Sequence, residues 1–311
     1  GTRLFALLQS AAIQDSSAGN AANRKQTRLL VYDVSSNPTP DAPILEYALT
    51  LPTYTGLGDG GAVNATAAQS EVVALDNFRL LVLSRDGNGL GSVALSPSVV
   101  KSILLVDTRV GNPTDFAGSG RDGEGGKITS ASGVLDASLT ALSRVEAVNM
   151  LNSAQLNKFN ILLDTGSGQV SQLTLGEKWE GLSLVPASDP SRPDDYFLFI
   201  ANDNDFLTSS GFMRGPGAGV SGTVVPYTGG TIVPYNGFPP SPPTSGGYPA
   251  NRLPANAPGG GVNANDTMFL VFRVTIAATP QVSQGGFLYN RATRQFSQQA
   301  TITNTTGSSL T

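Results

Sequence analysis

Residues 70–86 read SEVVALDNFRLLVLSRD, and this stretch indicates the fold class of the chain. Two apolar runs flank a turn at Asp76–Asn77, which is the pattern of a β-hairpin. Residues 180–205 repeat the design, with EGLSLV before a longer loop and YFLFIANDND after it. In each stretch a Glu begins the first strand and acidic residues follow the second, and these positions lie at the same end of an antiparallel pair. The sequence therefore predicts an all-β protein in which carboxylates gather at one rim and form a cation or polar-ligand site.

Short runs of the same kind recur along most of the 311 residues. They are rich in β-branched and aromatic residues and are bounded by Gly, Pro, Asn or Asp, as strands usually are. The expected strands are Arg3–Leu8, Arg28–Val34, Ile44–Leu51, Glu71–Leu75, Phe78–Leu83, Ser102–Asp107, Phe159–Asp164, Val170–Leu175, Glu180–Val185, Tyr196–Ala201, Met268–Ile276 and Gly286–Asn290. One helix is expected at Ser138–Leu151, where good helix formers occur without Pro.

The expected strands occur in small groups separated by long irregular stretches, which is the rhythm of blades packed around an axis. A sandwich would space its strands more evenly. We therefore predict that residues 1–311 form a single all-β portion of a β-propeller. The Gly- and Pro-rich stretch at about 211–265 is expected to be a surface loop, which lies over sheet edges or forms a lid over a binding face.

The strand predicted at Arg3–Leu8 begins at its own turn, with no partner strand before it. An unpaired edge of that kind is a template for unwanted pairing. The expectation is that this chain supplies the C-terminal blades of the propeller. An N-terminal fragment of the same protein is the partner expected to supply the first blades.

The chain contains no His and no Cys. This composition excludes a Ser–His–Asp triad, a cysteine nucleophile and a zinc site built from Cys or His. Carboxylate, amide and hydroxyl oxygens remain, and such ligands favour calcium, magnesium or manganese. The net charge is −4 and no basic cluster is present, which argues against nucleic acid as a partner. No apolar run reaches the ~18 residues of a membrane span.

Three Asn-X-Ser/Thr tripeptides make Asn64, Asn265 and Asn304 candidate glycosylation sites. Tripeptides of this kind also arise by chance in a chain rich in Thr, Ser and Asn. They are compatible with a secreted glycoprotein, and an extracellular location is therefore an expectation.

Several segments, in their order and spacing, resemble the phytase-like proteins, whose domain is called the esterase-like domain of phytase. The matching segments are Glu71–Leu75 with Arg79–Asp86, Lys101–Asp107, and Lys178–Leu182 followed by Asn202–Phe206. The resemblance spans roughly residues 1–276 and implies a secreted β-propeller of a kind common in fungi and bacteria. It also implies that this chain carries the C-terminal part of the domain. By resemblance to related propellers, calcium-dependent hydrolysis of phosphoesters or lactones is the implied activity.

The first candidate site lies at the acidic end of the second hairpin. Glu180 begins one strand, and the oxygens of Asn202, Asp203, Asn204 and Asp205 follow the other. Calcium takes about 6–8 oxygen ligands of these types, so Glu180, Asn202, Asp203 and Asp205 are predicted metal ligands. The alternative is an ordinary turn, because Asn and Asp favour turns.

The second candidate site consists of Glu71, Arg85 and Asp86 at the end of the first hairpin. Glu71 is a further predicted metal ligand. Arg85 is predicted to bind an anionic oxygen such as phosphate, because its forked donors suit that geometry. The alternative is an ion pair of Arg85 with Glu71 or Asp86 that fixes the rim.

Three other features are interpreted as structural. Asp164–Ser167 matches the aspartic-protease tetrapeptide but has no second copy with which to share a proton. The loop at Gly118–Lys127 lacks the Gly–Lys–Ser/Thr ending of a phosphate loop and is expected to be flexible. Trp179 is expected to be a packing anchor between blades rather than a surface on which a ligand stacks.

The sequence thus predicts a secreted, divalent-cation-dependent hydrolase acting on phosphoesters or other esters, with a small anionic or ester substrate. The cation, predicted to be calcium, would polarise the substrate and lower the pKa of a bound water. Glu180 would be a ligand or general base, and Arg85 would bind the anion. Two alternatives are a non-catalytic binding or structural propeller stabilised by calcium, and a lactonase-type hydrolase.

Overall fold

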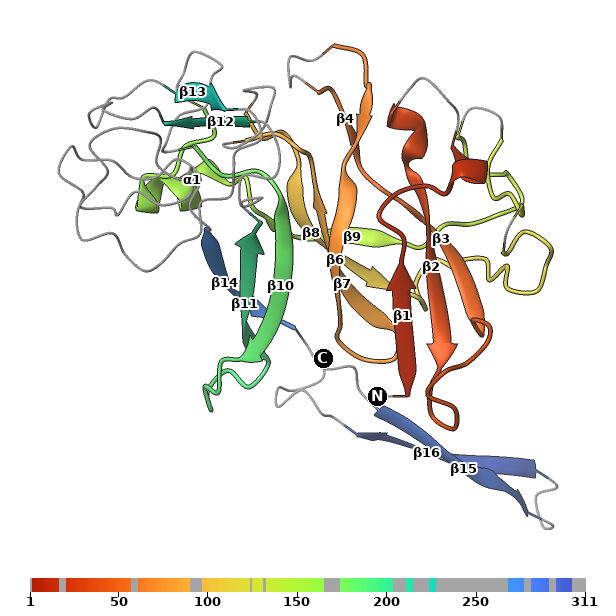
Figure 1. Ribbon diagram of the computed structural model, residues 1–311. Helices are drawn as coiled ribbons and strands as arrows, with labels where there is room; N and C mark the ends of the chain where they lie inside the picture. The colour runs from red at the N-terminus through yellow and green to blue at the C-terminus, as the bar shows by residue number, and fades with distance from the viewer. Residues whose placement is uncertain are drawn as a thin grey trace. The chain divides into compact units, whose positions relative to one another are not determined.

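A computed structural model describes the backbone and side chains of residues 2–16, 21–56, 61–89, 97–123, 125–130, 133–164, 174–203 and 268–276. It also describes the backbone of strands at 211–214, 224–227, 281–290 and 295–303. The described residues form antiparallel sheets and short helical turns, which confirms the all-β class (Figure 1). The chain divides into two compact units, one of residues 1–182 and 201–269 and one of residues 183–200 and 270–311.

Two larger sheets lie wholly within the first unit, and each follows the order of the chain. The three-stranded sheet has the order β1 (Arg3–Leu7), β2 (Gln26–Asp33) and β3 (Leu45–Thr50). The four-stranded sheet has the order β6 (Ala68–Ala74), β7 (Arg79–Arg85), β8 (Lys101–Asp107) and β9 (Arg144–Asn149). Two short pairs are also present, β4 (Thr53–Tyr54) with β5 (Ala65–Thr66) and β12 (Gly211–Arg214) with β13 (Val224–Tyr227).

The remaining strands form two further sheets. A three-stranded sheet has the order β10 (Trp179–Pro186), β11 (Asp195–Asn202) and β14 (Phe269–Thr275), and the division between the two units falls within these strands. A separate hairpin in the second unit pairs β15 (Gln281–Asn290) with β16 (Gln295–Thr303). The described helical segments are η1 (Ile13–Asp15), η2 (Ala21–Arg24), α1 (Ser153–Leu156) and η3 (Asn157–Phe159).

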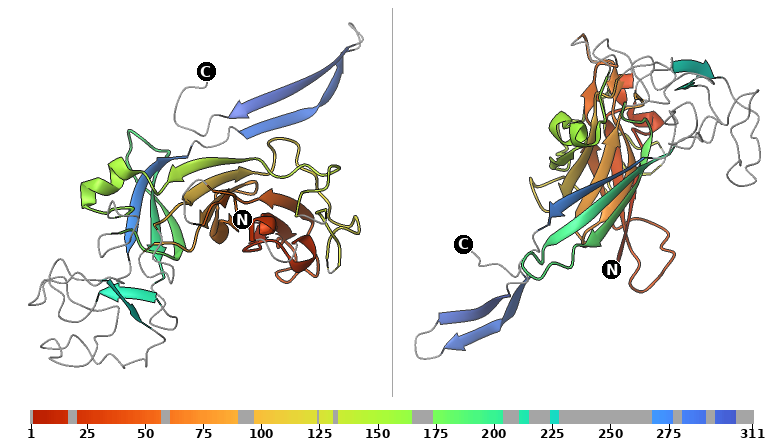
Figure 2. Two further views of the ribbon diagram at one scale, coloured as in Figure 1. Left: turned by 90° about the horizontal axis from the view of Figure 1, so that it is seen from above. Right: turned by 90° about the vertical axis from the view of Figure 1, so that its left-hand side faces the viewer.

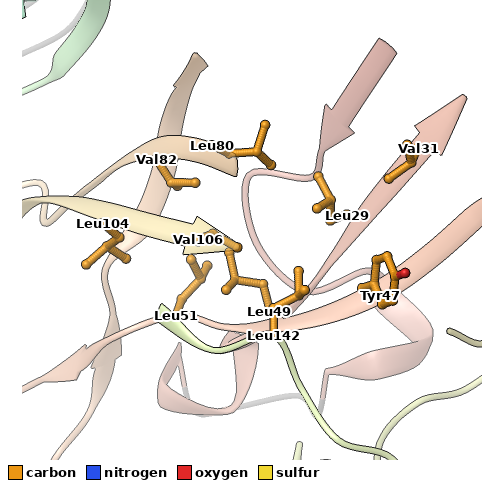
Figure 3. Packing of buried hydrophobic residues seen from close by; sticks show 10 residues of the cluster. All are labelled: Leu29, Val31, Tyr47, Leu49, Leu51, Leu80, Val82, Leu104, Val106 and Leu142. Atoms are coloured by element: carbon orange, nitrogen blue, oxygen red, sulfur yellow. The ribbon is translucent and has the colours of Figure 1, made fainter. Parts of the chain in front are cut away.

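The core of the first unit is built from one face of each of its two larger sheets. Leu80 and Val82 of β7 and Leu104 and Val106 of β8 are buried, and antiparallel pairing of Val82 with Leu104 places them on one face. They form one cluster with Leu29, Val31, Tyr47, Leu49, Leu51 and Leu142 (Figure 3). Because side chains alternate along a strand, Arg85 at the end of β7 belongs to the opposite face.

A β-bulge interrupts β6 near the end of the four-stranded sheet. The register of β6 and β7 shifts between Gln69 and Glu71, so Ser70 is the extra residue. The Ser70 hydroxyl donates a hydrogen bond of 2.7 Å to the backbone carbonyl of Trp179, the first residue of β10. The bulge therefore ties the end of this sheet to the strand on which Glu180 lies.

The helix predicted at Ser138–Leu151 is wrong. Residues Arg144–Asn149 form β9, which pairs with β8 at the edge of the four-stranded sheet. Helix propensity is a weak prior that tertiary context overrides. Here the edge of β8 offers a row of backbone donors and acceptors that strand pairing satisfies and a helix would leave unpaired.

Most of the predicted strands are confirmed, with ends that differ by a few residues. The strand predicted at Phe159–Asp164 is wrong, because η3 extends to Phe159 and the rest contributes one isolated bridge between Leu162 and Thr174. Most of the strand predicted at Val170–Leu175 lies outside the described residues. Strand β16 was not predicted, because its sequence QFSQQATIT is mostly polar and gives a weak strand signal.

Candidate functional site

Arg85 and Glu180 form an ion pair between the end of β7 and the start of β10. The Nη2 of Arg85 donates to Oε1 of Glu180. The Arg85 side chain is 10% exposed and that of Glu180 is 35% exposed, so the pair runs from the interior to the surface. The sequence alternative paired Arg85 with Glu71 or Asp86, whereas the observed partner lies 95 residues away along the chain.

One buried donor of Arg85 has no acceptor among the described residues. Its Nε makes no hydrogen bond, and Nη1 has only a long contact of 3.4 Å to the backbone carbonyl of Asp86. Leaving a buried donor unsatisfied costs about 1–3 kcal/mol. Nε and Nη2 form one edge of the guanidinium, which binds two oxygens of a carboxylate or phosphate side by side. Glu180 therefore occupies half of an edge suited to an oxyanion.

Asp86 forms its ion pair with Lys101 and not with the neighbouring Arg85. Its carboxylate pairs with Lys101 Nζ at 2.8 Å, and both side chains are 0% exposed. Lys101 Nζ also donates to the carbonyl of Asn88 at 2.9 Å. Burial lowers the pKa of the Lys101 ammonium, and the charge of Asp86 opposes that shift. The Asp86 carboxylate further accepts from three backbone amides, those of Asn88, Val99 and Val100.

Trp179 fixes the start of β10 and hence the position of Glu180. The chain adopts a left-handed conformation at Lys178, with φ of 47°, immediately before the strand. Trp179 is completely buried, and its Nε1 donates to the carbonyl of Gly176 at 2.8 Å. Its own carbonyl accepts from the bulged Ser70. The buried position agrees with the predicted packing role.

The other described residues predicted as metal ligands take part in hydrogen bonds with backbone groups. Glu71 accepts from the next backbone amide at 2.8 Å. Asn202 is buried, and its Oδ1 accepts from the backbone amide of Met268 at 2.5 Å. The backbone amide of Asp203 donates to the carbonyl of Lys178 at 2.8 Å. The bonds of Asn202 and Asp203 join the ends of β10, β11 and β14 within the first unit.

The described oxygen ligands do not by themselves assemble a calcium site. Among residues whose side chains are described, no three carboxylates lie close enough to share a metal ion. Calcium needs about 6–8 oxygens, and Glu180 and Asn202 already use oxygens for Arg85 and a backbone amide. Asn204 and Asp205 lie outside the described residues. The calcium site stays a prediction.

The candidate glycosylation sites also stay predictions. Asn64 is exposed immediately before β5, and its Oδ1 accepts a hydrogen bond of 2.7 Å from the backbone amide of Gly56. Asn265 and Asn304 lie outside the described residues.

The Gly-rich loop at Gly118–Lys127 is held by specific hydrogen bonds in its described part. Asp122 accepts from the backbone amides of Gly118 at 2.7 Å and Gly120 at 3.0 Å, so these amides are already used. A Cβ at Gly126 would lie 2.4 Å from the backbone of Arg121, so only Gly fits there. The loop therefore differs from the flexible segment expected from the sequence, and its rejection as a phosphate loop agrees with these bonds.

A buried charge network under this loop was not predicted from the sequence. Arg28 of β2 donates from Nε to Asp15 at 2.6 Å and from Nη1 to Glu46 at 2.8 Å. It also donates to the backbone carbonyls of Arg121 at 2.9 Å and Gly126 at 2.8 Å. Two buried carboxylates thus face one guanidinium. Burial raises the pKa of the Glu46 carboxyl, although Arg28 opposes that shift.

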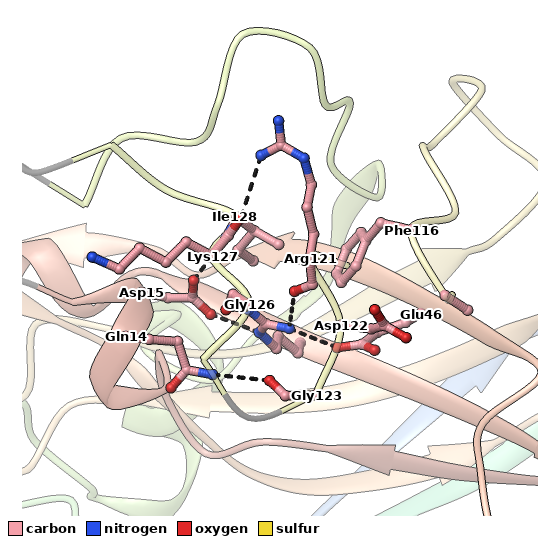
Figure 4. Close-up of polar contacts among 12 residues, drawn as sticks. Gln14, Asp15, Glu46, Phe116, Arg121, Asp122, Gly123, Gly126, Lys127 and Ile128 are labelled. Carbon is pink, nitrogen blue, oxygen red and sulfur yellow. Dashed lines mark hydrogen bonds and ion pairs between the residues drawn. The ribbon is translucent and has the colours of Figure 1, made fainter. Parts of the chain in front are cut away.

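Figure 4 shows the loop residues gathered around Asp15 and Glu46. The backbone amide of Ile128 donates to Asp15 at 2.8 Å, and the Phe116 ring lies 5.5 Å from the Arg28 guanidinium carbon. In Figures 1 and 2 the chain between β8 and β9 runs beside the N-terminal helical turns. The sequence contained one signal for this network, which is an Arg among the apolar residues of a predicted strand. An Arg in such a place is almost never fully buried unless charged or polar partners are present.

These observations define an all-β protein with an arginine–glutamate pair at the end of its strands. The chain belongs to the phytase-like family, described as having the esterase-like activity of phytase, and the family match covers residues 1–206. The match confirms the resemblance seen in the sequence, and it includes Arg85, Lys101 and Glu180.

The chain is 34% identical over 219 residues to a protein of Arthroderma benhamiae (strain ATCC MYA-4681 / CBS 112371) called "Uncharacterized secreted protein". The aligned region is 68% of this chain and 41% of that relative, so the chain spans about two fifths of the relative's length. The relative's name confirms the expected secreted location. No solved structure matches the chain. Within the described residues, no helix has the length and apolar character needed to cross a membrane.

Proposed function

We propose that the protein is a secreted hydrolase of anionic esters, with phosphoesters as the first substrate class to test. The observation that carries the proposal is the buried Arg85 Nε–H, which has no acceptor among the described residues, while Nη2 on the same edge pairs with Glu180. The family description as esterase-like activity of phytase supports ester hydrolysis as the reaction class.

In this proposal Arg85 binds the substrate and Glu180 acts on water. An oxyanion that takes both Nε and Nη2 displaces Glu180 from Nη2 and leaves its carboxylate free beside the ester. Glu180 then accepts a proton from water while the water oxygen bonds to phosphorus or to the acyl carbon. The ester bond to the leaving oxygen breaks, and that oxygen takes a proton from solvent. The partial exposure of Glu180 is consistent with access to water.

The propeller is also part of the proposal. The sheet β6–β7–β8–β9 has four antiparallel strands in chain order, which is the form of a propeller blade. In a propeller the ends of successive blades surround a common channel, so residues from β7 and β10 would line the same opening.

Replacing Arg85 should abolish most activity on anionic esters. Arg85→Met is expected to lower kcat/KM for p-nitrophenyl phosphate by about 100-fold, because it removes the charged donors that bind the anionic oxygens of the phosphate group. Arg85→Lys should recover little, since a lysine has no fork. Assays of the full-length protein on p-nitrophenyl phosphate, phytate and p-nitrophenyl acetate measure the effect. Arg109→Met is the control, because Arg109 is half-exposed and pairs with Asp107.

An equal loss on phosphate and neutral acetate esters would contradict anion binding by Arg85. Hydrolysis of neither class by the wild-type full-length protein would end the hydrolase proposal.

Calcium dependence is proposed separately, on the basis of Glu71, Glu180, Asp203 and Asp205 as oxygen donors. We expect EDTA to lower both activity and the melting temperature of the full-length protein, and calcium to restore both. Magnesium at the same concentration is the control, because it demands a tighter octahedral site. Full activity after exhaustive chelation would show that hydrolysis does not depend on a divalent cation.

A further inference from the structure

Lys101 occupies an unusual place for a lysine, because its charged end is fully enclosed beside the proposed anion site. Lys101 on β8 lies directly opposite Arg85 on β7 in the antiparallel register. Residues opposite each other in such a pair project from the same face of the sheet. Two cations therefore stand side by side at the end of the four-stranded sheet, but their partners differ. Arg85 pairs with Glu180, whereas Lys101 pairs with Asp86.

Both carboxylate oxygens of Asp86 are already occupied by other donors, so neither accepts a hydrogen bond from Arg85. One carboxylate oxygen accepts from Lys101 Nζ and the amide of Asn88, and the other accepts from the amides of Val99 and Val100. Arg85 reaches only the backbone carbonyl of Asp86, and that contact is 3.4 Å long. Asp86 is 1% exposed, so without Lys101 its charge would have neither a cation nor water to compensate it.

We propose that Lys101 is a positioning residue that keeps Arg85 available for an anionic substrate by holding Asp86. This inference rests on the proposed anion site at Arg85. The neighbouring carboxylate would otherwise compete for the guanidinium and repel an incoming anion. With Lys101 in place, the charge of Asp86 is neutralised within the sheet. The Nε–H of Arg85 then stays available to donate a hydrogen bond to the ligand.

The test is a double-mutant cycle on inorganic phosphate binding by the full-length protein, measured by calorimetry. Lys101→Met removes the cation that neutralises Asp86, and we expect phosphate affinity to fall by about tenfold or more. The double variant K101M/D86N removes the competing carboxylate as well, and we expect its affinity to return to within about threefold of wild type. A purely structural role for Lys101 predicts instead that the double variant binds phosphate no more tightly than the single variant.

The single variant Asp86→Asn keeps the experiment decisive if Lys101→Met does not fold. The proposal expects Asp86→Asn to bind phosphate at least as tightly as wild type, because the substitution removes the negative charge that Lys101 otherwise has to neutralise. A loss of phosphate binding in Asp86→Asn, or an unrestored loss in the double variant, would overturn it. Absence of phosphate binding by the wild type would also overturn it. Phosphate binding with the expected cycle but without ester hydrolysis would support this inference while removing the proposed catalytic function.

Discussion

Arg28→Met should destabilise the fold by about 3–5 kcal/mol at neutral pH. The substitution leaves the carboxylates of Asp15 and Glu46, both at most 2% exposed, without a cation or water. It also leaves the carbonyls of Arg121 and Gly126 without their donor, so the loop between β8 and β9 loses its attachment to β2. Urea unfolding followed by circular dichroism measures the change.

The loss should depend on pH in a definite direction. Burial raises the pKa of Glu46 in the folded state. A group with a raised folded-state pKa stabilises the fold below its unfolded pKa, and that contribution is lost as the pH rises through the folded value. Removal of Arg28 raises the pKa of Glu46 further, because the opposing guanidinium is gone. The deficit of Arg28→Met should therefore be largest near pH 7 and smaller towards about pH 4.

Glu46→Gln is the matched control for this network. The Gln carbonyl still accepts from Arg28 Nη1, while the substitution removes one of the two carboxylates that face a single guanidinium. We expect a change in stability within about 1 kcal/mol and a weaker dependence on pH between about 4 and 7. A large loss in Glu46→Gln, or an Arg28→Met deficit that grows as the pH falls, would contradict this account of the network.

The sequence predicted the local elements well because each hairpin is encoded by its own residues. Alternating apolar runs and the turn at Asp76–Asn77 are enough to place β6 and β7. The helix predicted in place of β9 failed for the opposite reason. Residues Arg144–Asn149 are a strand because β8 offers an edge to pair with, and that edge is not visible in their own sequence.

The sequence identified the main residues of the candidate site, but it did not predict which of them form ion pairs with each other. Arg85 and Glu180 were both identified, since each lies at a strand end in a repeated pattern. Their contact joins positions 95 residues apart, so the order of the sheets decides it and local spacing cannot. Lys101 was not predicted as a site residue, because a lysine at the start of an apolar strand usually extends its charged end into water.

Trp179→Ala should destabilise the first unit by about 3–5 kcal/mol, the largest loss expected from truncating one apolar side chain among those that the structure describes. The Trp179 side chain is 0% exposed, so its removal leaves a cavity of indole size. It also leaves the carbonyl of Gly176 without the Nε1 donor at 2.8 Å. Phe159→Ala is the control, because that side chain is 73% exposed and its removal creates no buried cavity.

Trp179→Phe separates packing from the hydrogen bond. The ring still fills most of the space while Nε1 is lost, so we expect a smaller loss of about 1–2 kcal/mol. Gly176, which accepts the Trp179 bond, also packs closely against Asn202 at the end of β11. A Cβ at Gly176 would lie 3.0 Å from Nδ2 of Asn202. A shift of Gly176 therefore disturbs Asn202 as well as the start of β10. If Trp179→Ala unfolds no more easily than Phe159→Ala, then Trp179 does not anchor β10, and the fixed position of Glu180 beside Arg85 must have another cause.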